Sequence, residues 1–183
     1  MDINLLVKIT ARAWSLHILA LLHDGVPGRQ AALLSQMPAG RTAFAASMSH
    51  LVDLKLVERN PGHGHPLRPE FRLTPGGVQA ARVAKRIVSA VGNPDGAAFS
   101  LLRRRWSVPI LSITNAPTRF SDIKAALPSI TDRALSQSLY RLEEQAWLRR
   151  SFDTSRRSPR PIYQAANTGA AISTILRPQN NWA

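Results

Sequence analysis

The chain repeats one pattern at a distance of about half its length. Trp14 is followed four residues later by Ile-Leu, and Trp106 begins the same arrangement 92 positions further on. The stretch 56–59, Leu-Val-Glu-Arg, returns as Trp-Leu-Arg-Arg at 147–150, 91 positions later. Because solenoid repeats recur every ~20 to 50 residues, a period this long predicts two copies of one small domain.

The boundary between the copies is predicted at Gly92-Asn93-Pro94-Asp95-Gly96, where turn-forming residues are most concentrated. The expected domains are therefore residues 1–92 and 93–183. A chain of 183 residues has room for two small domains.

The chain is strongly basic. Its formal net charge is +13, and 20 of its 24 cationic residues are arginine. A guanidinium pairs with phosphates and guanine edges better than a lysine ammonium does, so a polyanion is the simplest partner. The plainer alternative is a basic protein that is merely soluble. Cysteine is absent, which excludes disulfides, thiolate nucleophiles and cysteine metal sites.

The apolar stretch 5–22 is interrupted by Lys8, Arg12 and His17. This spacing predicts an amphipathic helix rather than a signal peptide or a membrane span. We therefore expect a cytoplasmic protein.

The second half carries signals for two consecutive helices. Ser121 is a candidate N-cap for a short helix over 122–127, and Thr131 is a candidate N-cap for a second helix. The apolar residues of the second helix recur at helical spacing and should face a core: Leu135, Leu139, Leu142 and Ala146. The opposite face is polar: Arg133, Ser136, Gln137, Tyr140, Arg141 and Glu144. This pattern is typical of a helix-turn-helix motif.

Two predicted strands follow, over 147–152 and 162–165, joined by a loop rich in arginine, serine and proline. The loop places Arg156, Arg157 and Arg160 at the tip of a β-hairpin. Such a basic hairpin beside a helix-turn-helix motif has the character of a wing.

The second half resembles the HxlR-type branch of the MarR-like winged-helix transcriptional regulators. The resemblance rests on segments that occur in order over most of this half: 106–111, 118–123, 127–131, 133–137, 142–144 and 167–169. The first half is similar more weakly: Trp14, 18–19, Pro38, Leu51, 56–59 and 71–76. This similarity implies a bacterial protein that binds operator DNA as a homodimer, with the second helix of the motif in the major groove and the wings against phosphate.

Combined with the repeat, the resemblance implies a mainly α fold with small β-hairpin wings (α+β). Two tandem winged helix-turn-helix domains would form a pseudo-dimer within one polypeptide. In symmetric dimers two recognition helices reach half-sites about 34 to 36 Å apart. We expect a pseudo-dimeric monomer or a homodimer.

This chain departs from the family pattern at several positions. Ser138 and Tyr140 stand where the family commonly has basic residues, and Ala146 replaces the glycine usual before the wing. In the first half, the equivalent outward face is nearly uncharged: Thr42, Ala46, Ser49 and His50. That face cannot make the bidentate arginine contact to guanine, so we expect a degenerate first recognition helix and a second domain that anchors the protein.

The predicted contacts to double-stranded DNA are of two kinds, base-edge contacts from the helices and phosphate contacts from the wings. The candidate residues are Arg133, Ser136, Gln137, Tyr140, Arg141, Arg149, Arg150, Arg156, Arg157, Arg160, Arg41, Thr42, His50 and Arg68. The alternative for the helix residues is an ordinary solvated face.

Other features have simpler interpretations. Three arginines, Arg103, Arg104 and Arg105, precede Trp106. Positive charges are unfavourable at a helix N-terminus because of the helix dipole, so we expect that helix to begin earlier, near Pro94. Trp14 and Trp106 are predicted to pack in cores. His63 and His65 lack a third ligand, so we predict no metal site and no cofactor. No catalytic motif is present, and we do not expect an enzyme.

Two further functions remain open. A small-molecule effector could bind between the domains, near a helix predicted over 78–91. Alternatively, this helix and the apolar helices around Trp14 and Trp106 could bind another protein. We expect a short closing helix over 170–176, a largely unstructured tail over 177–183, and association with the nucleoid rather than with a membrane.

Overall fold

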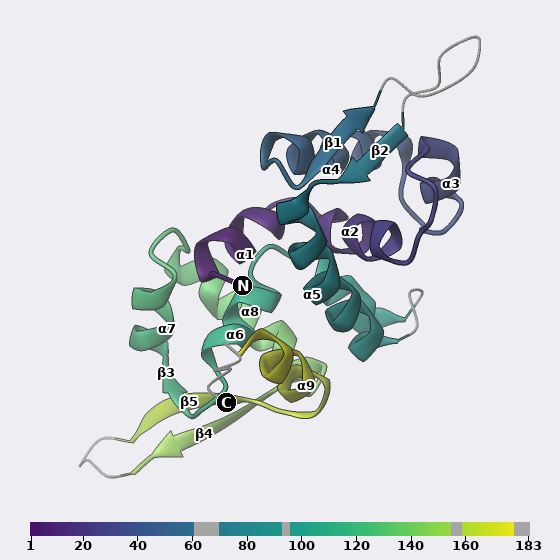
Figure 1. The fold of residues 1–183 in the computed structure, drawn as a ribbon. Coiled ribbons are helices and arrows are strands. Elements are labelled where there is room, and N and C mark those ends of the chain that lie inside the picture. The colour runs from purple at the N-terminus through teal and green to yellow at the C-terminus, as the bar shows by residue number, and fades with distance from the viewer. Residues whose placement is uncertain (61–69, 93–95, 155–158, 178–183) are drawn as a thin grey trace, which may run out of the picture. The chain divides into compact units, whose positions relative to one another are not determined.

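The computed structural model describes residues 1–60, 70–92, 96–154 and 159–177. These residues form two compact units (Figure 1). The first unit is Val7–Arg104, and the second unit is Arg105–Ala183 together with Met1–Leu6. No helix in the described ranges is both long enough and apolar enough to cross a membrane.

The first unit is mainly helical. In chain order its elements are the end of α1 (Ile3–Ile9), α2 (Ser15–His23), α3 (Gln30–Leu34), α4 (Arg41–Asp53), β1 (Val57–Asn60), β2 (Glu70–Leu73), α5 (Pro75–Val91) and the 3-10 helix η1 (Ala97–Arg103). Strands β1 and β2 form an antiparallel hairpin in which Val57 lies opposite Leu73. Helix α2 packs against α5 and α4, and the core between them includes Ile18, Leu51 and Ile87.

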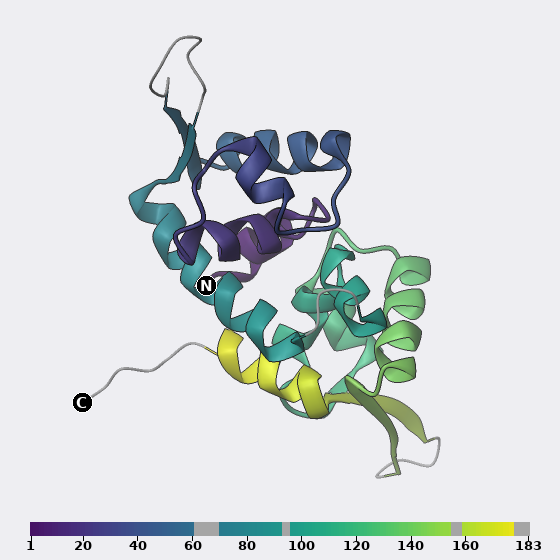
Figure 2. The same cartoon turned by 90° about the vertical axis from the view of Figure 1, so that its right-hand side faces the viewer.

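The second unit has the same order of helices and hairpin. Its elements are α6 (Ser107–Ile113), β3 (Thr118–Arg119), α7 (Phe120–Ala126), α8 (Asp132–Glu144), β4 (Leu148–Asp153), β5 (Arg160–Ala165) and α9 (Asn167–Leu176). The sheet order is β3-β5-β4, with both pairs antiparallel. The β4–β5 hairpin projects from the body of this unit (Figure 2). The predicted fold class, mainly helical with small antiparallel hairpins, is confirmed.

The compact units differ from the boundary predicted between residues 92 and 93, because η1 packs in the first unit. The Phe99 ring lies 5.2 Å from the His17 ring in an edge-on arrangement. The Arg103 guanidinium lies 5.0 Å from the Trp14 ring. These contacts extend the first unit to Arg104.

Several predicted helix boundaries, and the predicted burial of Trp106, were wrong. The stretch 5–22 forms two helices, α1 and α2, instead of one. No continuous helix leads into Trp106: η1 ends at Arg103, and α6 begins at Ser107. The Trp14 side chain is buried, whereas that of Trp106 is only partly covered, with the Arg105 guanidinium 4.6 Å from its ring.

The helix expected over 122–127 begins earlier, at Phe120, and Ser121 is not its cap. The Ser121 hydroxyl instead donates to the Asp122 carboxylate, at 3.1 Å. Arg119 occupies the N-cap because β3 pairs with β5 and delivers the chain directly into the helix. The closing helices also begin earlier than expected, at Pro75 and Asn167. Residues 178–183 of the predicted tail lie outside the described ranges.

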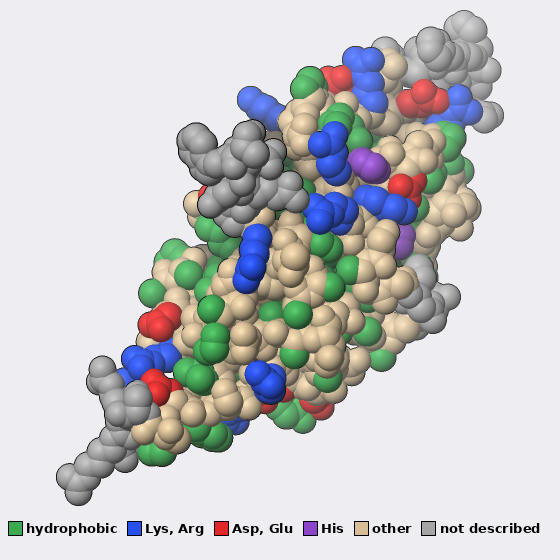
Figure 3. Space-filling model, turned by 60° about the horizontal axis from the view of Figure 1, so that its bottom comes forward, with side chains coloured by type: hydrophobic (Ala, Val, Ile, Leu, Met, Phe, Trp, Pro, Cys, Tyr) green, Lys and Arg blue, Asp and Glu red, His purple; other side chains and the backbone are tan. Residues whose placement is uncertain are grey.

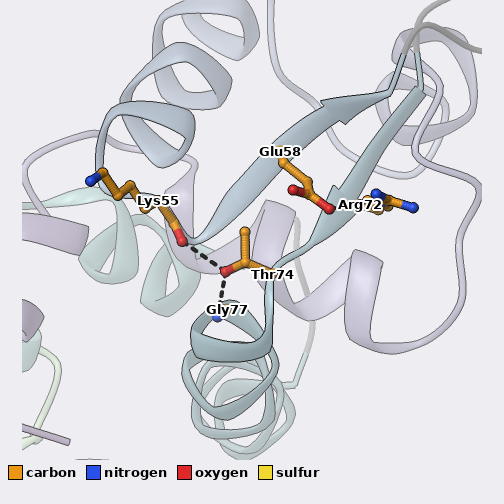
Figure 4. Close-up of polar contacts among 5 residues, drawn as sticks. All are labelled: Lys55, Glu58, Arg72, Thr74 and Gly77. Carbon is orange, nitrogen blue, oxygen red and sulfur yellow. Dashed lines mark hydrogen bonds and ion pairs between the residues drawn. The ribbon is translucent and has the colours of Figure 1, made fainter.

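Each hairpin is joined to the next helix by a close backbone approach at a glycine. Thr74 caps α5: its hydroxyl accepts from the Gly77 N–H at 3.0 Å and donates to the Lys55 carbonyl at 2.7 Å (Figure 4). A Cβ at Gly77 would lie 1.8 Å from the Leu56 carbonyl oxygen. A Cβ at Gly169 of α9 would lie 2.0 Å from the Trp147 carbonyl oxygen. Glycine is therefore required at both positions.

Gly77→Ala should lower the free energy of unfolding by about 1 to 3 kcal/mol, because backbone must move to admit the methyl group. The control is Gly76→Ala in the same helical turn, where the nearest atom would be 3.9 Å away. That change should be neutral or stabilising by up to about 1 kcal/mol. Urea unfolding followed by circular dichroism measures both, and equal effects would contradict this account.

The ring of His17 is buried in the first unit between aromatic side chains. It is 6% exposed, and its ring lies 6.1 Å from that of Trp14 in addition to the Phe99 contact. Burial lowers the pKa of His17, and a hydrogen bond to the Gln36 backbone opposes this shift. The fold therefore favours the neutral imidazole.

Because the folded pKa of His17 is depressed, its stabilising contribution is present above the unfolded pKa of about 6.5 and is lost as the pH falls below it. His17→Leu should therefore show a smaller loss of unfolding free energy between about pH 7 and pH 5. Urea titrations at several pH values measure this pH dependence, and a parallel slope in His17→Leu would overturn the assignment.

Candidate nucleic-acid interface

Helices α7 and α8 form the helix-turn-helix motif of the second unit. The turn between them is fixed by buried Leu127 and Ile130, and by Ile123 at the inner face of α7. The Thr131 hydroxyl accepts from the Ala134 N–H at 3.2 Å, so the predicted cap of α8 is confirmed. These contacts hold the first turn of α8 in a single orientation.

Lys124 also holds this turn, a role that sequence reasoning did not assign. Its ammonium lies 2.5 Å from the Ile130 carbonyl oxygen and 2.7 Å from a carboxylate oxygen of Asp132. One cation therefore bridges α7, the turn and the first residue of α8. In the sequence, Lys124 and Asp132 are eight residues apart. This spacing predicts no contact until the conformation of the turn between them is known.

The two faces of α8 divide as predicted. Leu135, Leu139 and Leu142 are buried. The exposed face carries the candidate DNA-binding residues of this helix: Arg133, Ser136, Gln137 and Tyr140, with Arg141 partly covered. Within the described ranges, the side chains of Arg133 and Gln137 form no hydrogen bond or ion pair. Their polar groups are available to an external partner.

Tyr140 is the large exposed side chain of this face, at 62%. A hydrogen bond to the Glu144 carboxylate, together with the charge of that group, raises the pKa of Tyr140. The phenol therefore stays protonated. At neutral pH, Tyr140 offers an aromatic surface and a hydroxyl rather than a negative charge.

The end of α8 differs from the prediction at Ala146, which is exposed instead of contributing to the core stripe. The helix ends at Glu144, and Ala146 adopts a left-handed conformation with φ 54°. The Trp147 N–H donates to the Leu142 carbonyl at 2.8 Å, and the Ala146 N–H donates to the Glu143 carbonyl at 2.9 Å. This pair of bonds is a Schellman motif, and it turns the chain sharply into β4.

Strands β4 and β5 form the predicted wing. Arg149 lies opposite Gln164, and Arg150 lies opposite Tyr163. The Arg150 guanidinium lies 5.3 Å from the ring of the exposed Phe152, and Arg149 reaches Gln164 at 3.5 Å. Arg160 was predicted in the loop at the tip, but it begins β5, where it is exposed and pairs with Asp153 of β4. Arg156 and Arg157 lie outside the described residues.

An ion pair ties the wing to the helix-turn-helix motif. Arg119 of β3 bonds to Asp153 at the end of β4, with 2.6 Å between the atoms. Sequence reasoning used Arg119 only as part of the family resemblance. Its partner is distant in sequence, so the pair could not be assigned before the order β3-β5-β4 was known.

The first unit offers fewer candidate contacts. Arg41 and Thr42 are exposed at the start of α4. One ring nitrogen of His50 lies 2.7 Å from the Lys8 carbonyl oxygen, so this side chain is engaged with backbone near the end of α1. Arg68 lies outside the described ranges.

The charge on the surface is mainly positive. On the face in Figure 3, several Lys and Arg side chains lie over the upper and central part of the view, and Asp and Glu side chains lie mostly toward its edges. In the described part of the chain, no group of three or more His, Asp or Glu residues could hold a metal ion. His63 and His65 are outside that part.

Comparisons with known proteins agree with this geometry. The model of the HxlR-like helix-turn-helix family matches residues 101–183. An uncharacterized HTH-type transcriptional regulator, YvaP of Bacillus subtilis (strain 168), is 34% identical over 88 residues, which are 47% of this chain and 80% of that protein. The HTH-type transcriptional regulator YodB of the same organism is 29% identical over 87 residues, 47% of this chain and 77% of that protein. No solved structure matches at a significant level.

The left-handed conformation of Ala146 gives a testable consequence for the motif. A side chain in this region costs about 1 to 2 kcal/mol that glycine avoids, so Ala146→Gly should stabilise the chain by roughly that amount. Ala134→Gly, inside α8, is the opposite control and should destabilise by about 1 kcal/mol. Thermal unfolding measures both. A lower melting temperature for Ala146→Gly would refute the strain at this turn.

Proposed function

Since this chain belongs to the HxlR-like helix-turn-helix family, we propose that it regulates transcription by binding operator DNA mainly through its second unit. The observation that carries the proposal is the exposed polar face of α8 beside an arginine-bearing hairpin in the same unit. A helix of this kind fits the major groove, while hairpin cations meet flanking phosphates. A regulator of this kind would act in the cytoplasm, where bacterial DNA lies.

The residues of α8 divide by chemistry. Gln137 can form a bidentate pair with adenine, and Arg133 can pair with guanine or with a phosphate. Ser136 and Tyr140 add a hydroxyl and an aromatic surface, and Arg141 lies at the margin of the exposed face. These side chains are the proposed means of sequence recognition.

The wing residues are proposed to bind the DNA backbone. Arg149 and Arg150 of β4 and Arg160 of β5 are exposed. Arg156 and Arg157, in the segment between these strands, are proposed to act with them. Guanidinium groups on an extended hairpin can reach phosphates without reading sequence, so the wing would supply affinity rather than discrimination.

We further propose that the two units are tandem copies of one winged-helix domain. Helices α4 and α8 each have 13 residues. Lys55 follows α4 with φ 57°, as Ala146 follows α8 with φ 54°. The Leu56 N–H donates to the Leu51 carbonyl at 3.0 Å, which repeats the bond from Trp147 to Leu142. Equivalent contacts at a constant offset of 91 residues support a duplication.

The edge of the sheet supports the same proposal. In the second unit Arg119 of β3 pairs with Ile162 of β5. In the first unit the Phe71 N–H donates to the Gly28 carbonyl at 2.8 Å, and these residues also precede the pair by 91 positions. A chain with two such units could present both recognition helices of a dimer. In that arrangement the first unit would add contacts to DNA from Arg41 and Thr42. The polar face of α4 would bind DNA more weakly than that of α8.

Binding of the full chain to the duplex upstream of its own gene tests the main proposal. Gln137→Ala should reduce the preference for that duplex over a scrambled one, by about 1 to 3 kcal/mol at a single base position. The double change Arg149→Gln and Arg150→Gln should weaken binding to both duplexes and lower the salt slope by about 1.8. Fluorescence anisotropy over a series of salt concentrations measures both quantities.

The control for the wing is Arg72→Gln. Arg72 lies in the hairpin of the first unit and pairs with Glu58 at 2.6 Å, so its charge is already balanced. This variant should retain the salt slope of the unmodified chain. Equal binding to the promoter and scrambled duplexes by the unmodified chain would overturn the proposed function.

A further inference from the structure

The first unit has a cavity of about 280 Å³ between α4, the start of α3 and the β1–β2 hairpin. Phe44 and Met48, each 2% exposed, belong to its apolar lining together with Val52 and Phe71. Gln30 and Arg59 supply its main polar groups. Small-molecule sites range from about 300 to 1,000 Å³, so this volume suits a compact ligand.

The side chains of α4 explain why a hollow lies here. At an offset of 91 residues, Ser49 of α4 corresponds to Tyr140 of α8, and Val52 corresponds to Glu143. The first unit thus lacks a phenol ring and a carboxylate that the second unit carries on the same helical face. The small side chain of Ser49 and the apolar side chain of Val52 line an open, apolar space between α4 and the hairpin.

The charge at this cavity is a single cation. Arg59 and Phe71 are direct partners across the hairpin, and both line the cavity. The two carboxylates of the hairpin are already paired with other cations. Glu58 pairs with Arg72 at 2.6 Å, and Figure 4 shows these two side chains on neighbouring strands. Glu70 pairs with Arg29 at 2.5 Å. Among the described residues, Arg59 forms no ion pair. An anion from outside the unit would therefore meet an uncompensated guanidinium.

We propose that this cavity binds a small amphiphilic carboxylate, with its apolar body against Phe44 and Met48 and its carboxylate on Arg59. A charge-assisted hydrogen bond to the guanidinium fixes the acid group, and the Gln30 amide can add a donor. The proposal goes beyond DNA binding and rests on residues of the first unit alone. It assigns α4 and the first hairpin a ligand-binding role.

The methionines of the chain provide a direct readout. There are three: Met1, Met37 and Met48. Met48 lines this cavity, Met37 is buried elsewhere, and Met1 lines a separate apolar cavity in the second unit. Octanoate added to the full chain carrying methyl-13C methionine should shift the Met48 methyl resonance in a saturable way. The Met37 and Met1 resonances should stay in place.

Three variants test the geometry. Arg59→Gln should weaken octanoate binding by about tenfold or more, while leaving any binding of the neutral analogue octanol unchanged. Ser49→Tyr places an aromatic ring at the lining of the cavity and should abolish the Met48 shift. Ala46→Tyr is its control, because Ala46 is exposed on the same helix and does not line the cavity.

Absence of a Met48 shift in the unmodified chain would overturn the proposal, as would a shift confined to Met1. Equal octanoate affinity in Arg59→Gln would remove the assigned role of the guanidinium. No DNA is present in these titrations. Failure here therefore leaves the promoter-binding measurement unaffected, and failure there leaves this one unaffected.

Discussion

The backbone reversal after α4 and after α8 determines how the helix, the hairpin and the closing helix of each unit meet. In the second unit, the Trp147 N–H closes the end of α8 on Leu142, and the Trp147 carbonyl accepts from the Ala166 N–H at 2.9 Å. The same carbonyl lies against Gly169 of α9. The backbone of one residue, Trp147, therefore joins α8, the hairpin and α9. Leu56 does the same in the first unit through Leu51, Thr74 and Gly77.

Local signals were sufficient wherever neighbouring residues determine the structure. The Thr131 cap, the leucine stripe of α8 and the two strands of the wing were all predicted from spacing within a few turns of chain. Their register could not be predicted in detail, because pairing of Arg150 with Tyr163 depends on the length of the intervening loop. The sequence thus predicted where helices and strands form better than it predicted which residues pair between them.

The errors arose where distant contacts override local preference. Ser121 is a good cap in isolation, but the pairing of Arg119 with Ile162 fixes the chain two residues earlier. The segment at 97–103 was expected to continue into the helix at Trp106. It packs instead as η1 in the first unit, where Phe99 meets the buried His17. Lys124 and Arg119 were likewise unassigned, because each bonds to atoms that only the folded chain brings near.

The proposed duplication gives a physical reason for the difference between the two helical faces. A homodimer carries every substitution on both recognition helices, so a change that weakens DNA contact is present twice. In a tandem chain, α4 can change while α8 retains Gln137 and Tyr140. Small or apolar side chains at Ser49 and Val52 of α4 bear on both proposed roles. They offer few polar groups to bases, and they line the cavity beside Arg59. The weaker polar face and the proposed ligand site thus involve the same few positions of α4.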